Sequence, residues 1–208
     1  MNAPQTSESE TDRSLRPGHT SLVSTFLVPP GTPLEWAADA IRALGVVLFV
    51  VGLIGWGPLA GAVLALTLLG LVAPRFLGVR ASLDLSSQVV LLLAAWCSVL
   101  DLYRSLPWID IPVHFALNGL LALLAVVAAD RAGLHLPPRR VVLVVATLTV
   151  GLALAAVWEI GEWAGNRLDD SVLVGYDDSI LDMAVGGLGA AAAGLVVPAA
   201  LRADRWRA

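Results

Sequence analysis

The sequence predicts an all-α integral membrane protein with six transmembrane helices and with its N- and C-termini in the cytoplasm. The first observation is composition: 57% of the 208 residues are hydrophobic and 14% are charged, whereas about a quarter are charged in a soluble domain. The second is a set of apolar runs of about 20 residues, the length that crosses a bilayer. The third is the distribution of arginine, which sets the orientation. The sequence shows no dense basic surface, so nucleic acid is not an expected partner.

The elements follow in order from the N-terminus. Residues 1–33 are expected to form a disordered cytoplasmic tail, because the first 20 are polar and rich in Ser, Thr and Glu. The run 43–73 carries no charge but is too long for one ordinary span, and "GWGP" at 55–58 indicates a turn between two helices. Asp39 and Arg42, three residues apart at the start of the first span, are expected to pair. The approximate spans are residues 36–55, 58–74, 86–103, 111–129, 141–161 and 179–201, within a bundle of residues 34–203 that is followed by a cytoplasmic end at 204–208.

Arginine positions test the number of spans, because cytoplasmic loops attract Arg and Lys. Six spans place ten arginines on the cytoplasmic side and two outside, whereas a single span over 43–73 would move the N-terminus outside and give eight against four. The cytoplasmic ten are Arg13, Arg16, Arg75, Arg80, Arg131, Arg139, Arg140, Arg202, Arg205 and Arg207, and the outer two are Arg104 and Arg167. Tryptophans are expected at both boundaries: Trp56, Trp108, Trp158 and Trp163 outside, and Trp36 and Trp206 inside.

Ionisable residues gather at the outer ends of the last three spans. His114 lies four residues after Asp110, and Asp182 four residues after Asp178, so each pair shares one helix face. A charge near the centre of a span costs about 2.5–3.5 kcal/mol, and such groups therefore usually face the bundle interior. We expect an outward-facing pocket here. Its expected binding residues are Asp110, His114, Glu159, Glu162, Asp178 and Asp182.

Three helices bring His114, Glu159 and Asp182 to a similar depth, which makes these three the candidates for metal ligation and for catalysis. An imidazole with carboxylates suits a divalent metal such as zinc or manganese, and it also suits general acid–base work. Structural alternatives stay open. Ser179 and Asp182 match a helix capping box, Asp110 matches an N-cap, and Glu159 could reach the interface. No H-E-x-x-H motif or cysteine cluster is present.

Small residues recur every four positions along the last span, at Gly186, Ala190 and Gly194. Such spacing lets helices approach closely. We therefore expect this span to pack centrally, beside the fourth or fifth. The same kind of face would also suit a homo-oligomer.

Three segments carry a family resemblance: "IDIPVHFALNGLLALL", "WEIGEW" and "DDSILDMAVGGLGAAAAG". Together they resemble the YjdF-like family of uncharacterised bacterial inner-membrane proteins, and more distantly VanZ-like proteins, which are associated with glycopeptide resistance. The resemblance implies several helices in a bacterial plasma membrane, and it implies the same polar set of six residues. One position departs from the pattern, because Gly186 stands where the family tends to carry an acid.

The leading functional hypothesis is a multi-pass membrane protein whose His/carboxylate pocket binds a lipid or envelope headgroup or a divalent metal. The first alternative is a metal-dependent intramembrane lipid hydrolase. The second is a small proton-coupled transporter. The inner halves of the last three spans are almost wholly apolar, and no internal inverted repeat is evident in the sequence. Both observations argue against transport.

Overall fold

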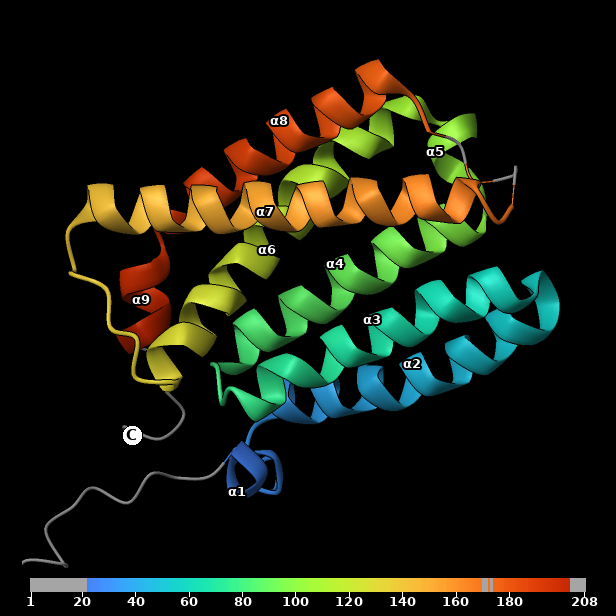
Figure 1. Cartoon of the computed structure of the whole chain (residues 1–208). Coiled ribbons are helices and arrows are strands. Elements are labelled where there is room, and N and C mark those ends of the chain that lie inside the picture. The colour runs from blue at the N-terminus through green and yellow to red at the C-terminus, as the bar shows by residue number, and fades with distance from the viewer. Residues whose placement is uncertain (1–21, 170–171, 173, 203–208) are drawn as a thin grey trace, which may run out of the picture.

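A computed structural model describes residues 22–169, 172 and 174–202, and these residues contain helices and no strand (Figure 1). Six of the helices are long and four are short. The long ones are α2 (Pro33–Trp56), α3 (Pro58–Phe76), α4 (Ala81–Val99), α6 (Asp110–Arg131), α7 (Arg140–Asn166) and α8 (Tyr176–Gly194). The short ones are α1 (Leu22–Phe26), α5 (Leu102–Ser105), the 3₁₀-helix η1 (Pro107–Ile109) and α9 (Val197–Arg202).

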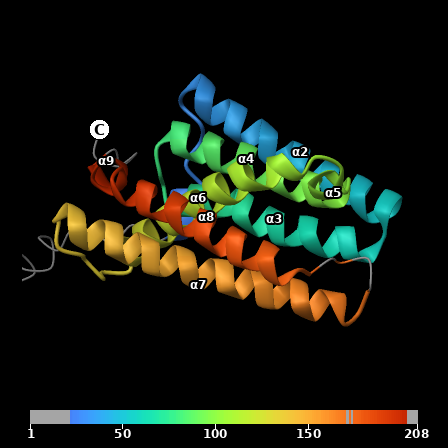
Figure 2. The same cartoon turned by 90° about the horizontal axis from the view of Figure 1, so that it is seen from above.

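The long helices run back and forth along one common direction (Figures 1 and 2). We name the two ends of this bundle after residues that lie there. At the Arg42 end α2 and α4 begin, and at the His114 end α6 and α8 begin. The parallel pair α2 and α4 therefore runs opposite to the parallel pair α6 and α8.

The bundle consists of two units of three helices. In the first unit α2, α3 and α4 all pack against one another, and in the second unit α6, α7 and α8 do the same. The two units are joined mainly through the packing of α4 on α6. At the Arg42 end α9 closes this joint, because Val197 and Ala200 enter a buried cluster with Leu83 of α4 and Val127 of α6.

Five of the described helices are long and apolar enough to cross a membrane, counting η1 with α6. They are Pro33–Trp56, Pro58–Phe76, Ala81–Val99, Pro107–Arg131 and Arg140–Asn166. Their outward faces carry large exposed apolar side chains, such as Ile54 with 80% of its surface accessible. In water such faces would be unfavourable, so these helices support a bilayer environment. α8 is not among the five.

The turn expected near residues 55–58 is present. α2 ends at Trp56, Gly57 has φ +88°, and Pro58 opens α3. Glycine suits this turn because residues with a side chain rarely adopt that backbone conformation. Proline suits the next position because the first residue of a helix needs no N–H donor. The uncharged run 43–73 is thus divided between two helices.

Several predicted boundaries differ from the structure. The third span was expected at 86–103, but α4 begins at Ala81 and ends at Val99, because a separate turn follows it. The last span was expected to continue to 201, but α8 ends at Gly194 before α9. Part of the expected disordered tail is helical: α1 packs on α3, with Phe26 stacked on Phe76 at 4.4 Å between ring centroids. Residues 1–21 and 203–208 lie outside the described residues.

Candidate cation site at the His114 end

Two carboxylates and one imidazole meet at the His114 end, between α6 and α8. His114 Nε2 lies 3.2 Å from Asp110 Oδ1 and 3.7 Å from Asp182 Oδ2. One ligand atom from each of the three residues lies within 4.8 Å of the others. Their side chains are 17%, 13% and 6% exposed for Asp110, His114 and Asp182. We call these three residues the His114 cluster.

Local sequence explains why both acids are available. Asp110 is the first residue of α6, with Ile109 as its N-cap, so the carboxylate is not used as a cap. α8 begins at Tyr176 with Gly175 as its N-cap, which places Asp182 inside the helix. The capping box expected from Ser179 to Asp182 is therefore absent. Asp182 Oδ1 is buried and has no hydrogen-bond partner among the described residues.

Glycines allow α6 and α8 to approach closely just beneath the cluster. A Cβ on Gly189 would lie 2.0 Å from the carbonyl oxygen of Phe115, and one on Gly119 would lie 2.9 Å from the carbonyl oxygen of Gly189. A Cβ on Gly186 would meet the amide nitrogen of Asn118 at 2.0 Å. Glycine therefore sets the spacing of the two helices that carry the ligands, and the Asn118 side chain fills the space over Gly186.

α8 also packs closely on α7. A Cβ on Gly151 would lie 2.2 Å from Cβ of Ala190, and one on Gly194 would lie 2.5 Å from Cα of Val144. The prediction that α8 packs centrally is confirmed, and it contacts both neighbours rather than one. On this helix the small-residue face is used within the chain. Association of copies through small-residue faces stays a prediction.

Tyr103 of α5 was not among the predicted site residues, yet it lies beside the cluster. Its ring centroid is 6.4 Å from that of His114, and its hydroxyl donates a hydrogen bond to the Ala94 carbonyl at 3.1 Å. Burial raises the pKa of the Tyr103 phenol, and nearby acidic groups raise it further. These groups are Cys97, Asp110, Glu162 and Asp182. The available signal in the sequence was Pro107, because proline favours a turn and so marks a break between Tyr103 and the following span.

The glutamates of α7 divide between two surroundings. Glu162 is half-buried and close enough to His114 for their charges to interact. Glu159, which was expected as a ligand with His114 and Asp182, is not in the group of close ligand atoms. α7 continues to Asn166, beyond the predicted end at 161, and two residues three apart on a helix differ by about 60° in direction. Asp178 is exposed on the first turn of α8 and interacts electrostatically with Asp182.

Among the described residues, Arg104 and Arg167 at this end have partners other than the His114 cluster. Arg104 pairs with Asp101 at 3.4 Å, with both side chains more than half exposed. Arg167 lies over the Trp163 ring, 5.2 Å from its centroid. The buried carboxylates therefore outnumber the basic groups that face them.

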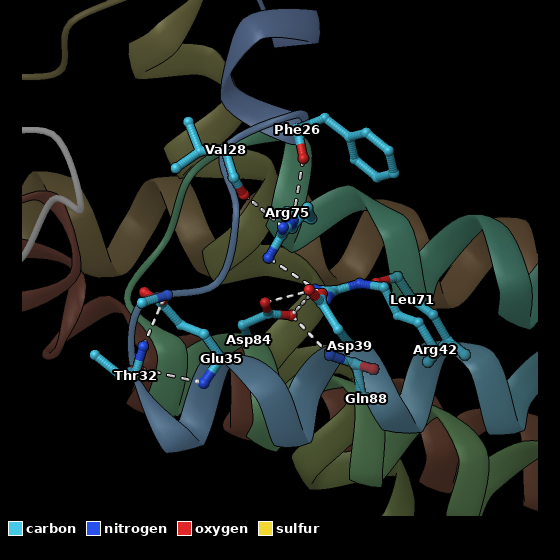
Figure 3. Close-up of polar contacts among 11 residues, drawn as sticks. Phe26, Val28, Thr32, Glu35, Asp39, Arg42, Leu71, Arg75, Asp84 and Gln88 are labelled. Atoms are coloured by element: carbon cyan, nitrogen blue, oxygen red, sulfur yellow. Dashed lines mark hydrogen bonds and ion pairs between the residues drawn. The ribbon is translucent and has the colours of Figure 1, made fainter.

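A second polar cluster lies at the Arg42 end (Figure 3). Arg42 donates to Asp39 at 2.5 Å, to Asp84 of α4 and to the Leu71 carbonyl at 3.0 Å. Arg75 of α3 lies 3.1 Å from the same Asp39 carboxylate. The predicted pairing of Asp39 with Arg42 is confirmed, whereas Asp84 and Arg75 were not expected in it. We call Asp39, Arg42, Arg75 and Asp84 the Arg42 cluster.

Two further contacts complete the second cluster. Fully buried Gln88 donates to Asp84 at 2.9 Å. Arg75 donates to the backbone carbonyls of Phe26 at 3.2 Å and Val28 at 2.7 Å, which fixes the segment after α1 beneath the bundle. Figure 3 shows Arg75 between this segment and Asp39.

Comparison with known proteins agrees with the class that the fold defines, a membrane protein with several apolar helices. A family model described as "Predicted membrane protein (DUF2238)" matches residues 39–203, and the chain belongs to this family. No curated protein and no solved structure matches the chain. The likeness to YjdF-like and VanZ-like proteins stays a resemblance.

Proposed function

We propose that this chain is a six-span protein of a bacterial plasma membrane that binds a divalent cation at its outer face, through Asp110, His114 and Asp182. α8 serves as the sixth span. Its place between α6 and α7, and its similar direction to α6, support this assignment. Both termini then lie in the cytoplasm, and the Arg42 end faces inward.

Charged and aromatic residues support the orientation. The Arg42 end holds Arg80, Arg139 and Arg140 as exposed residues, which suits a cytoplasmic face. Tryptophans at both ends are exposed, as expected for side chains at the membrane–water interface. They are Trp36 at 63%, Trp56 at 49%, Trp108 at 67% and Trp163 at 53% exposure.

The observation that carries the proposal is the unpartnered oxygen of Asp182. A buried charge without a partner is costly, because it loses water and gains nothing in return. Here the unpartnered oxygen belongs to a carboxylate that already lies near a second carboxylate and an imidazole. A cation among these three ligands would neutralise the charge and satisfy that oxygen.

Ligand chemistry narrows the choice of cation. Imidazole nitrogen with carboxylate oxygen suits zinc, and a carboxylate-rich set also suits manganese. Three protein ligands leave at least one coordination position open. At a site near the membrane surface, water or an anionic oxygen of a lipid or envelope headgroup would take that position. The surface pocket expected around the cluster stays part of this proposal.

Metal binding by the purified protein tests the proposal. We expect wild type to retain manganese or zinc after gel filtration and to gain thermal stability from either ion. His114→Ala and Asp182→Asn should weaken binding by more than about tenfold, the size of effect seen even for outer-shell groups. Asp177→Asn is the matched control, because Asp177 is an exposed acid on the first turn of α8. Equal metal content in wild type and Asp182→Asn would remove the site.

A further inference from the structure

In the structure the two three-helix units repeat one arrangement in opposite directions, a relation that the sequence alone does not reveal. In each unit a short helix comes first, followed by three mutually packed long helices: α1 before α2–α4, and α5 before α6–α8. The first and third long helices are parallel within a unit and antiparallel between units (Figure 1). Inverted repeats of this kind occur in membrane proteins, where corresponding positions serve related roles.

Charged side chains occupy corresponding places in the two units. The first long helix carries an acid and then a basic group about one turn later, Asp39 with Arg42 and Asp110 with His114. The third long helix supplies an acid near its beginning, and this acid contacts the same basic group. A leucine precedes each of these acids, Leu83 before Asp84 and Leu181 before Asp182.

The second long helix supplies a charge near its C-terminal end in both units, but the two charges have opposite sign. Arg75 near the end of α3 faces Asp39. Glu162 near the end of α7 interacts electrostatically with His114. Each cluster also lies beside its short helix: Arg75 binds the Phe26 carbonyl at the end of α1, and Tyr103 of α5 lies beside His114.

Charge is balanced in only one of the two clusters. In the Arg42 cluster two guanidinium groups face two carboxylates, and the formal charges cancel. In the His114 cluster two carboxylates share one imidazole, and Glu162 adds a further acid nearby. The same arrangement therefore has its cation built in at one end and lacks one at the other.

We propose that the chain is an inverted repeat and that the guanidinium of Arg42 is the fixed counterpart of the cation bound at the His114 end. This inference rests on the proposed function. The residue at the position of Arg42 or His114, together with the charge of Arg75 or Glu162 beside it, decides whether a cluster is permanently neutralised or takes an exchangeable cation. Within the part of the chain that the structure describes, there is accordingly one exchangeable cation site, at the outer end, and a closed ion-paired cluster at the inner end.

One detail departs from strict correspondence. Gln88 follows Asp84 by one turn on α4, whereas Gly186 holds that place after Asp182 on α8. The amide is supplied instead by Asn118, one turn after His114 on α6, whose side chain fills the space over Gly186. Both units thus bury an amide beneath the cluster, although from different helices.

Exchange of the two basic residues tests the inference. His114→Arg should place a permanent positive charge against Asp110 and Asp182 without metal. Its Tm in chelator should exceed that of His114→Gln by about 5 °C or more, a shift that corresponds to one or two kcal/mol in a chain of this size. Manganese should leave that Tm unchanged. A Tm of His114→Arg at or below that of His114→Gln would overturn the inference.

The reverse exchange gives a second readout. Arg42→His combined with Asp182→Asn should bind one manganese ion, measured by equilibrium dialysis, whereas Asp182→Asn with Arg42 intact should bind manganese more weakly than wild type by more than about tenfold. A folded double variant without manganese would overturn the inference. If the double variant does not fold, the His114→Arg comparison decides. If wild type itself binds no metal, the proposed function fails, but the comparison of His114→Arg with His114→Gln still tests the correspondence of the clusters.

Discussion

Gly189→Ala should destabilise the protein strongly, because a new methyl group would meet backbone rather than a flexible side chain. The Cβ would lie 2.0 Å from the Phe115 carbonyl oxygen, whereas carbon–oxygen contacts are about 3.3–3.6 Å. α6 and α8 would have to separate by about 1 Å or more at this point. Overpacking of a tight interface costs about 1–3 kcal/mol. For a chain of this size 3 kcal/mol lowers Tm by about 6–12 °C.

The single cysteine provides the assay. Cys97 is 1% exposed, so a thiol-reactive fluorogenic dye reports unfolding when the thiol becomes accessible. Gly161→Ala is the matched control, because Gly161 lies within α7 and nothing is within 4 Å of its added Cβ. We expect the control to match or slightly exceed wild type, since alanine favours helix by about 1 kcal/mol over glycine. If Gly189→Ala unfolds at the same temperature as Gly161→Ala, the glycine contact does not set the spacing of α6 and α8.

Three further predictions concern other parts of the chain. Arg75→Gln should lower the free energy of unfolding by about 3–5 kcal/mol, because it breaks a buried ion pair. Arg80→Gln is the control, since Arg80 is exposed, and it should leave Tm unchanged. Equal losses of Tm in the two variants would refute the role of Arg75. Gly57→Ala should lower the free energy of unfolding by about 1–3 kcal/mol, because the backbone conformation of Gly57 favours glycine. Thermal unfolding followed by circular dichroism, with Gly55→Ala as the control, measures this loss. The raised pKa of Tyr103 means that its phenol ionises less readily in the folded state than in the unfolded state. The free energy of unfolding of wild type should therefore fall as the pH rises past about 10, the ordinary pKa of tyrosine. In Tyr103→Phe this fall should be smaller. Parallel pH–Tm curves for wild type and Tyr103→Phe would contradict this.

Much of the fold was predictable because bilayer thickness constrains the length of a membrane-spanning helix more strongly than packing does. Apolar runs located the first two helices closely, and the Gly57–Pro58 pair divided them. Depth along a helix was also predictable from its rise per residue. Counting inward from the helix starts placed His114 and Asp182 at one level, and the structure brings them within 3.7 Å.

Rotation of each helix about its axis was not predictable, because it depends on contacts with neighbouring helices. The sequence predicted Glu159 as a metal ligand beside His114 and Glu162 only as a binding residue, whereas Glu162 is the α7 glutamate whose charge interacts with His114. Asp84 lay outside the predicted third span and was therefore not considered as a partner of Arg42. Tyr103 was missed for the opposite reason, since it was placed inside that span.

Pulsed electron paramagnetic resonance of the manganese-loaded protein tests the central claim most directly. We expect coupling of the manganese electron spin to nitrogen of one imidazole, and we expect this coupling to disappear in His114→Ala while persisting in Asp177→Asn. A spectrum of the fully hydrated ion in wild type, with no nitrogen coupling, would contradict the cation site.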